Sequence, residues 1–286
     1  MKKVLLATTA LALSAGVASA EVALSGSARM GLVHTDAGTV LDNRLTVNID
    51  GSTETSSGLT FGGRLRIRSN DGDGALVNGA RVYMKSGAVE VAVGNIYGAI
   101  DSMPGLYQSE AGLVGNGAGD VVTVGYDAYD SDADQHNGVE VIYSAGAFTG
   151  HLSYSDADLS GIAGADKRTA AYGAYTMNDW TVALGMQDSS DNADDLTVLT
   201  VGGKVGDYGV GFSAADNDGA SKITLNGSAT FGAIGVSAFV SDAEGATDTA
   251  YGVGMSYDLG GASLVGAVER NTDGTNYADM GVSFSF

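Results

Sequence analysis

Residues 59–69 read LTFGGRLRIRS, and this segment decides the fold because its apolar and charged side chains alternate with a period of two. The apolar side chains occupy odd positions, at Leu59, Phe61, Leu65 and Ile67. Three guanidinium groups occupy even positions, at Arg64, Arg66 and Arg68. Successive side chains of a strand point to opposite faces, so the three arginines must lie along one side. The segment predicts a β-strand with one apolar face and one basic face.

The same alternation recurs along the chain and predicts sixteen strands. They are expected at about 22–34, 42–51, 59–69, 76–86, 88–96, 138–145, 147–156, 167–177, 179–188, 194–205, 207–216, 220–231, 233–242, 248–259, 261–270 and 277–286. A soluble antiparallel sheet would give the same pattern, with its polar face in water and its apolar face in a core. The alternation alone therefore leaves the environment of the sheet open.

The connections between these segments favour a membrane barrel. They alternate strictly between short links, such as 206–207 and 232–233, and longer acidic ones, such as SDADLSGIAGAD. Tight turns at one end, loops at the other and an even number of strands of ~10 residues are typical of outer-membrane barrels. No segment after the amino terminus has the ~20 apolar residues of a membrane helix, but a closed barrel crosses a bilayer with every backbone group paired. We predict an all-β, transmembrane antiparallel β-barrel of about 16 strands, formed by residues 21–286 as a single domain.

Residues 1–20 are predicted to be a signal peptide. Lys2 and Lys3 precede an apolar run, and Ala18-Ser19-Ala20 forms a small-residue cleavage signal. Removing this segment takes the formal net charge from −20 to −22. The chain has no cysteine, so it uses neither disulfides nor thiolate metal sites.

One long interruption breaks the regular series of strands, at about 97–137. It contains the only proline, Pro104, and seven carboxylates, at Asp101, Glu110, Asp120, Asp127, Asp130, Asp132 and Asp134. Long connections without secondary structure of their own are usually functional or disordered. We predict that part of this third outer loop folds into the barrel and narrows its lumen. The alternative is an outward surface loop with a solvated acidic face.

Aromatic residues recur within a few positions of the tight turns. They are Tyr143, Phe148, Tyr175, Trp180, Phe231 and Tyr257. Rings with polar handles favour the boundary between bilayer and water, so their recurrence predicts a girdle around the barrel. Any single one of these rings is equally compatible with cross-strand packing.

Four segments carry a resemblance to a known family. EVALSGSARMG at the predicted mature start, YSAGAF at 143–148, YDLGGAS at 257–263 and the terminal GVSFSF resemble the Rhodobacter-type general diffusion porins of alphaproteobacteria. The resemblance implies a homotrimer of sixteen-stranded barrels in the Gram-negative outer membrane, which passes small hydrophilic solutes. It also implies an inward third outer loop opposite a basic wall, and a terminal aromatic, Phe286, that the barrel-assembly machinery recognises.

The basic residues agree with such a layout. Seven of the twelve Lys and Arg residues after the leader fall in the first four predicted strands, namely Arg29, Arg44, Arg64, Arg66, Arg68, Arg81 and Lys85. An Arg at the lipid-facing midplane costs ~2–4 kcal/mol, so three on one strand are expected to face water. We expect this basic wall to face Asp101, Glu110 and Asp120 of the loop, which would create a transverse field. The alternative is that the arginines merely pair with strand acids such as Asp50 and Glu90.

The acidic loops suggest weak calcium binding, which the family resemblance supports. Carboxylates suit Ca²⁺, and the candidate ligands are Asp101, Glu110 and Asp120, although no ligand set follows from the pattern. The segment that begins at Asp156 starts like an EF-hand but has Lys167 where a bidentate Glu is needed. Divalent ions in the outer loops could also bridge to lipopolysaccharide. No cofactor is required by this interpretation, and the strong negative charge excludes nucleic acid as a partner.

Three classes of function remain open from the residues alone. A passive channel, of which a solute-specific channel is a variant, fits best, and we expect no enzymatic activity. A barrel-embedded hydrolase would need a histidine such as His151 facing the lumen beside a serine and a carboxylate, and neither G-x-S-x-G nor H-E-x-x-H occurs. A secreted β-rich structural protein would need its apolar strand faces to pack together, but these faces carry mostly Ala, Val and Gly.

Overall fold

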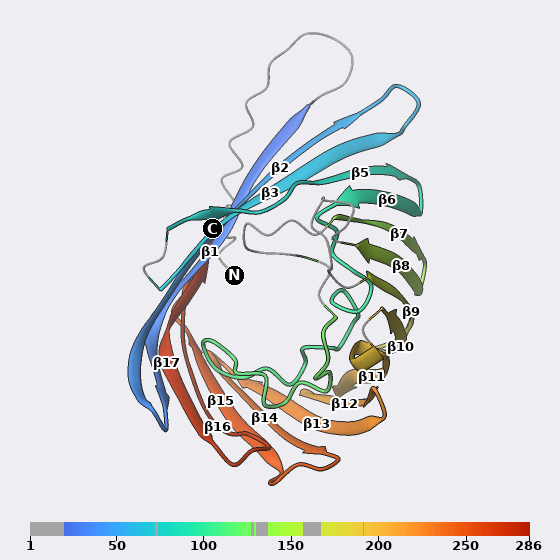
Figure 1. The fold of residues 1–286 in the computed structure, drawn as a ribbon. Helices are drawn as coiled ribbons and strands as arrows, with labels where there is room; N and C mark the ends of the chain where they lie inside the picture. The colour runs from blue at the N-terminus through green and yellow to red at the C-terminus, as the bar shows by residue number, and fades with distance from the viewer. Residues whose placement is uncertain (1–19, 72–73, 127–128, 130–136, 157–166, 191) are drawn as a thin grey trace.

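The computed structural model shows a closed antiparallel β-barrel with a long segment folded into its lumen (Figure 1). It describes residues 20–71, 74–126, 129, 137–156, 167–190 and 192–286. The predicted signal peptide lies outside these residues except for Ala20, so it stays a prediction. No helix in the described chain is long and apolar enough to cross a membrane.

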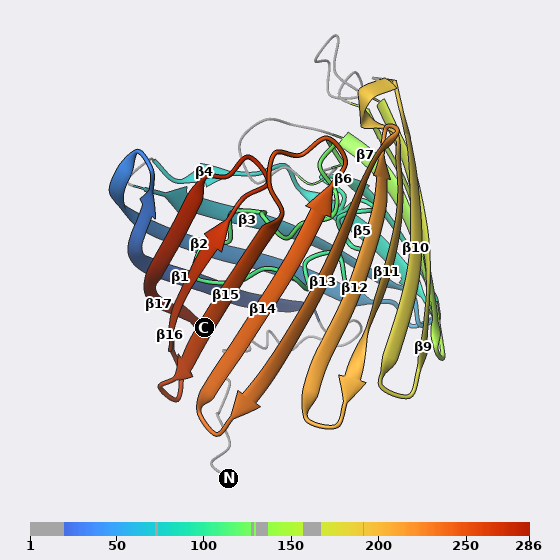
Figure 2. The ribbon, with the colours of Figure 1, turned by 90° about the horizontal axis from the view of Figure 1, so that it is seen from below.

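The strands agree closely with the predicted segments. The first half of the wall consists of β1 (Glu21–Thr35), β2 (Gly38–Glu54), β3 (Thr60–Asn70), β4 (Leu76–Val77), β5 (Arg81–Ser86), β6 (Val89–Gly94), β7 (Asn137–Ala145), β8 (Phe148–Asp156) and β9 (Lys167–Met177). The second half consists of β10 (Trp180–Ser189), β11 (Leu196–Val205), β12 (Tyr208–Asn217), β13 (Ala220–Phe231), β14 (Ile234–Ala243), β15 (Ala250–Asp258), β16 (Ser263–Arg270) and β17 (Asn276–Ser285), with one 3₁₀ turn at Asn192–Asp194. Figure 2 shows these strands tilted across the wall.

Sixteen strand positions close the barrel, because β4 and β5 are two parts of one strand. Both pair with β3, but the register shifts by one residue between them. Asn78 lies at this bulge, and its side-chain Oδ1 accepts a hydrogen bond from the Arg66 backbone N–H at 2.7 Å. The extra residue of a bulge disrupts the ladder locally, and the Asn78 side chain supplies the missing acceptor.

The barrel closes where β1 pairs with β17, from Ser27↔Ser285 to Thr35↔Tyr277. Phe286 extends this ladder by one step, since its N–H and C=O bond to the C=O and N–H of Gly26 at 2.9 and 2.7 Å. A lipid bilayer offers no hydrogen-bond partners, so closure satisfies the backbone groups that an open sheet would leave unpaired.

The strict alternation of short and long connections is wrong at two places. Only Asp36 and Ala37 separate β1 from β2, and only Asp218 and Gly219 separate β12 from β13, although both connections lie at the loop end. Asp218 and Gly219 both have positive φ angles, of 52° and 86°. Such a pair forms the tight hairpin turn that matches strand twist, so Asp-rich sequence there marks a turn rather than a loop.

The barrel is apolar outside and polar inside. Leu24, Leu41 and Val268 on the outer face are 70%, 76% and 62% exposed, whereas Glu140 and Thr200 on the inner face are each 1% exposed. The six aromatic residues near the tight turns all lie exposed as well. Apolar faces that do not pack against one another within the chain exclude the structural-protein hypothesis and fit a surrounding bilayer.

The segment after β6 lies inside the barrel, against the wall (Figure 1). Its apolar side chains Ile100, Met103, Leu106 and Val121 are buried against inward residues of the wall such as Val198. This apolar cluster inside the lumen holds the loop to one side. The prediction of an inward loop is therefore confirmed for its described part, and the surface-loop alternative is excluded there.

The contact between Gly26 and Phe286 allows a test of closure. A Cβ at residue 26 would lie 2.6 Å from both Phe286 Cζ and Thr46 O, so we expect Gly26→Ala to lower the free energy of unfolding by about 1–3 kcal/mol. Urea unfolding of the folded protein in detergent, followed by Trp180 fluorescence, measures the change. Gly51→Ala is the control, because nothing lies within 4 Å of a Cβ at that position. Equal effects of the two substitutions would contradict the closure argument.

Candidate functional site

A buried ionic network holds the point where the loop leaves the wall. Arg81 on β5 donates its Nε–H to Glu140 Oε1 on β7 and an Nη2–H to Glu90 Oε1, both at 2.7 Å. The other oxygen of Glu140 lies 2.9 Å from His151 Nε2 and accepts the Gly98 backbone N–H at 3.2 Å. The side chains of Glu140 and His151 are fully buried. Three strands and the first turn of the loop therefore share one carboxylate.

Two tyrosines of the loop lie against the arginine wall. The Tyr97 ring centroid is 4.2 Å from the guanidinium carbon of Arg81 and 5.9 Å from that of Arg64. The Tyr129 ring centroid lies 4.7 Å from the guanidinium carbon of Arg66, and the two tyrosine rings are 5.9 Å apart. A guanidinium over an aromatic face is attracted by the ring quadrupole. Neither tyrosine was predicted as a site residue, because its only signal in the sequence is its position near an end of the interruption.

The rest of the loop is bonded to inward polar side chains of β8, β11, β12, β13 and β17, and β17 is the strand that pairs with β1. The bonds are Ala99 N–H to Ser153 Oγ at 2.9 Å, Thr200 Oγ1–H to Pro104 O at 2.6 Å, Gln108 Nε2–H to Ser213 Oγ at 2.9 Å, Thr224 Oγ1–H to Gly119 O at 2.9 Å, and Leu113 N–H and Val114 N–H to the Asp279 carboxylate at 2.9 Å. Except for the bond from the Gln108 side chain, they satisfy backbone groups of the loop that have no strand partner.

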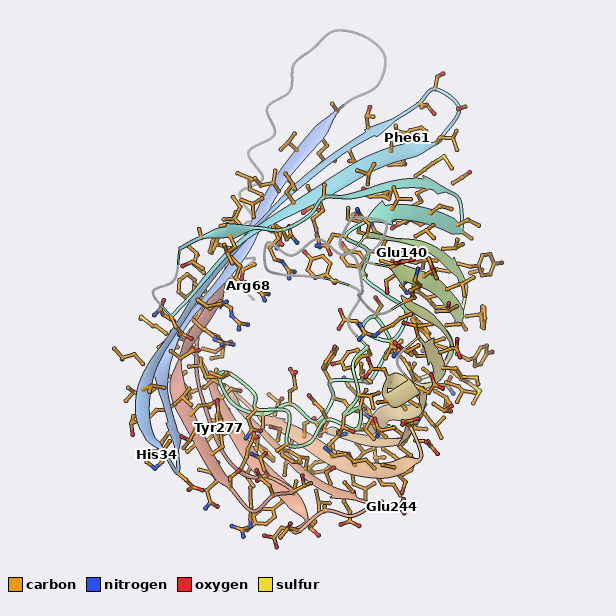
Figure 3. All side chains as sticks on the ribbon, viewed as in Figure 1. His34, Phe61, Arg68, Glu140, Glu244 and Tyr277 are labelled. Atoms are coloured by element: carbon orange, nitrogen blue, oxygen red, sulfur yellow. The ribbon has the colours of Figure 1, made fainter. Side chains whose placement is uncertain are left out.

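The predicted basic residues fall into two groups. Five of them, Arg29, Arg44, Arg64, Arg66 and Arg68, lie on the adjacent strands β1–β3. Figure 3 shows Arg68 pointing into the lumen. The other two lie elsewhere: Arg81 is 3% exposed within the buried network, and Lys85 is exposed at the end of β5 beside the tight turn at Gly87.

Neighbouring strand side chains hold most of the arginines of β1–β3. Arg29 makes two bonds of 2.9 Å to the Asp42 carboxylate, and Arg64 is bidentate to Asp50 at 2.6 and 3.1 Å. Arg66 donates its Nε–H to Asn48 Oδ1 at 3.1 Å. The alternative in which arginines pair with strand acids is thus correct for Arg29 and Arg64, as it is for Arg81 with Glu90. Pairing along the wall also restricts where these guanidinium groups point, and the hypothesis that the arginines face the loop carboxylates across the lumen stays a prediction.

The three predicted loop carboxylates do not form one group. Asp101 accepts a hydrogen bond from the Tyr107 hydroxyl, and burial raises its pKa while the positive charge of Arg66 opposes that rise. Glu110 and Asp120 interact with each other instead. Burial raises both pKa values, with the Asp120 charge adding to the effect at Glu110 and Lys222 of the wall opposing it at Asp120.

The structure brings no candidate metal site together in its described part, where no three His, Asp or Glu residues are grouped to hold an ion. Calcium binding at Asp101, Glu110 and Asp120 therefore stays a prediction. The other acidic residues of the interruption, Asp127, Asp130, Asp132 and Asp134, lie outside the described residues.

His151 is not placed for catalysis. Its side chain is fully buried between Glu140 and the edge of the Tyr172 ring, 5.6 Å away between centroids. Ser153, two residues further along β8, accepts a hydrogen bond from the Ala99 N–H of the loop and is itself buried. A substrate in the lumen has no access to such a group, so the arrangement is structural.

The described side chains leave a passage through the barrel between the arginines of β1–β3 and the loop (Figure 3). An apolar exterior, a polar interior and an inserted loop that narrows the lumen define the class: a water-filled channel for passive diffusion across an outer membrane, not an enzyme.

Comparisons with known proteins agree. A family model described as Gram-negative porin matches residues 7–278. The chain is 34% identical over 291 residues to a porin of Fuscovulum blasticum and 30% identical over 304 residues to a porin of Rhodobacter capsulatus, in each case over 93% of this chain and 100% of the relative. A solved structure of a mutant of Rh. blastica porin is similar with a TM-score of 0.86 at 32% identity, over 93% of this chain and 100% of that one. The chain belongs to the Gram-negative porin family.

Glu140 offers a direct test of the buried network. Glu140→Gln leaves Arg81 with one carboxylate in place of two, and we expect a loss of about 3 kcal/mol in the free energy of unfolding, as for other broken buried pairs. Urea unfolding in detergent measures it. Glu54→Gln, at an exposed position at the end of β2, is the matched control and should change stability by less than about 0.5 kcal/mol. An unchanged midpoint for Glu140→Gln would show that the network does not hold the loop.

Proposed function

We propose that the described part of the loop, residues 97–126 and Tyr129, and the arginines of β1–β3 form the narrowest part of the channel, where they control the passage of small hydrophilic solutes and ions. The observation that carries this proposal is the course of the loop along the inner wall from β8 to β17 (Figure 1). Its hydrogen bonds go to Ser153, Thr200, Ser213, Thr224 and Asp279, on β8, β11, β12, β13 and β17. The passage lies between this part of the loop and the arginines of β1–β3 (Figure 3).

The charges favour a field across the passage. Arg44, Arg66 and Arg68 lie on the wall side, and Asp101, Glu110 and Asp120 are carried by the loop. Opposed charges across a narrow, low-dielectric lumen orient water and favour polar solutes over apolar ones. The described residues show no separate binding track of stacked aromatics, because Tyr97 and Tyr129 already lie against arginines. General diffusion is thus better supported than a solute-specific channel.

We propose a homotrimer as the working assembly. The outer faces of β1–β3 continue beyond the ring of the barrel (Figure 1) and carry exposed Val22, Leu24 and Phe61. An apolar face that extends from the wall is suited to a second copy of the same chain. The same proposal includes contacts of the outer loops with lipopolysaccharide, bridged by Ca²⁺, and recognition of the Phe286 strand by the barrel-assembly machinery. No cofactor is needed for passive diffusion.

Conductance of the purified protein in a planar bilayer tests the channel and the assembly together. We expect large ohmic steps that close in threes at high voltage, since three lumens would share one inserted particle. The reversal potential measured in a salt gradient reports whether the loop carboxylates or the arginines dominate the ion selectivity of the channel. Folded protein that inserts without conducting would contradict the proposal.

The raised pKa values of Asp101, Glu110 and Asp120 predict a pH dependence of selectivity. Burial makes these carboxyls take up protons above their ordinary pKa of about 4, so lowering the pH from 7 towards that value removes negative charge from the loop before it would from unperturbed carboxyls. We expect the reversal potential to shift towards anion preference over this range. The triple variant Asp101→Asn, Glu110→Gln, Asp120→Asn should show a smaller shift.

Asp273→Asn is the control for this pH series. Asp273 lies in an exposed outer connection, and hydrogen bonds from Thr275 lower its pKa, so it stays charged throughout the range. The Asp273→Asn protein should keep the pH dependence of the unmodified protein. A triple variant that also keeps it would show that the loop carboxylates do not set selectivity.

A further inference from the structure

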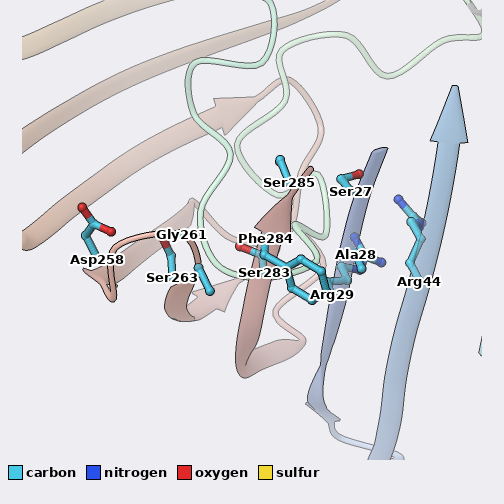
Figure 4. Close-up of a pocket in the computed structure, with 11 residues that line it drawn as sticks. Ser27, Ala28, Arg29, Arg44, Asp258, Gly261, Ser263, Ser283, Phe284 and Ser285 are labelled. Atoms are coloured by element: carbon cyan, nitrogen blue, oxygen red, sulfur yellow. The ribbon is translucent and has the colours of Figure 1, made fainter. Parts of the chain in front are cut away.

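A polar cleft of about 410 Å³ opens on the lumenal face where β15–β17 meet β1 and β2 (Figure 4). Its volume falls within the range of about 300–1,000 Å³ that is usual for small-molecule sites. Side chains that carry hydroxyl or charged groups line it, namely Ser27, Ser263, Ser283, Ser285, Arg29, Arg44 and Asp258. None of the serines was singled out by the sequence pattern.

Strand register explains why these residues meet. Residue pairs connect five strands in a single row, through Asp258↔Ser263, Ser263↔Ser283, Ser283↔Arg29 and Arg29↔Arg44. The next row on the same face contains Ser285↔Ser27 and Ser27↔Thr46. A row of serine hydroxyl groups therefore lies between the Asp258 carboxylate and two guanidinium groups. Asp258 lies at the tight turn after β15, and the guanidinium groups are on β1 and β2.

The arginine end of the cleft carries excess positive charge. Arg29 is neutralised by its two bonds to Asp42, which use Nε and Nη2. Arg44 donates its Nε–H to the neutral Asn70 Oδ1 at 2.7 Å and forms no ion pair with any carboxylate in the described chain. Asp42 and Asp71 act on Arg44 only through longer-range attraction, which the nearby charges of Arg29 and Arg66 oppose.

We propose that this cleft is a binding subsite for a small phosphate-class oxyanion, either free or as the monoester of a polyol. The guanidinium of Arg44 presents donors to the oxyanion, and charge-assisted hydrogen bonds of this kind are the strong ones. Ser27 and Ser283 add neutral donors beside it. Asp258 repels an anion at the opposite end, so a phosphorylated polyol lies with its phosphate at Arg44 and its hydroxyls along the serines.

This inference rests on the proposed function, because a solute reaches the cleft through the lumen. It adds a weak binding site for one class of solute to a channel that otherwise selects solutes by size and by the electric field across the passage. Conduction requires that such a site bind weakly enough to release the solute. We therefore expect millimolar dissociation constants rather than tight binding.

Titration calorimetry of the folded full-length chain in detergent, with inorganic phosphate as the probe, tests the subsite without depending on conductance. We expect saturable binding to the unmodified protein. Arg44→Gln should weaken it at least fivefold, and the double variant Ser27→Ala, Ser283→Ala about threefold. Lys204→Gln is the matched control, because it removes one exposed positive charge from the lumenal face of β11, outside the cleft, and should leave binding unchanged.

If Arg44→Gln does not fold, Arg44→Lys and the serine variant test the inference instead, because both keep the positive charge on β2. We expect weaker phosphate binding in each. Absence of saturable binding to the unmodified protein overturns the inference whether or not the protein conducts. Equal weakening by Arg44→Gln and Lys204→Gln also overturns it, because net charge would then be the cause. Saturable binding by a protein that does not conduct would contradict only the proposed function.

Discussion

The buried contact among Arg81, Glu140 and His151 is the interaction on which the working part of this molecule depends. A carboxylate taken out of water is costly unless opposite charge and hydrogen bonds surround it, and Glu140 receives donors from Arg81, His151 and the Gly98 backbone. The same contact turns the chain from β6 into the lumen. If the loop left the wall in another direction, the apolar side chains Ile100 and Met103 would lose their place against the inner surface.

The bilayer imposes the second constraint, and it accounts for the rest of the fold. Every strand must be paired, so β1 returns to β17 and Phe286 continues the ladder to Gly26. The apolar side chains of the strands therefore face the lipid, and the polar side chains face the lumen. A loop inside such a barrel has no conventional core to join. It is held by a small apolar cluster and by hydrogen bonds from inward side chains such as Ser153 and Asp279.

Contacts between paired strands and contacts with the loop tyrosines together position the charges in the lumen. Asp42 and Asp50 hold Arg29 and Arg64 in place on the strands, while tyrosines at the two ends of the loop cover Arg66 and Arg81. Arg44, bonded to a neutral amide, keeps its charge available to the lumen. Positive charge therefore remains on this wall, while burial raises the pKa values of Asp101 and Glu110 on the loop.

The sequence by itself determined which side chains face water and which face lipid, because the two faces of a strand follow from local geometry, as at Leu65 and Arg66. It also determined the number of strands and the place of the one long interruption. Only the tertiary structure decided the partners. Glu140 and Tyr97 meet Arg81 across β5, β7 and the loop, and Ser283 meets Arg29 from opposite ends of the chain. Such contacts depend on register and closure, and a period of two contains no information about which strand lies next to which.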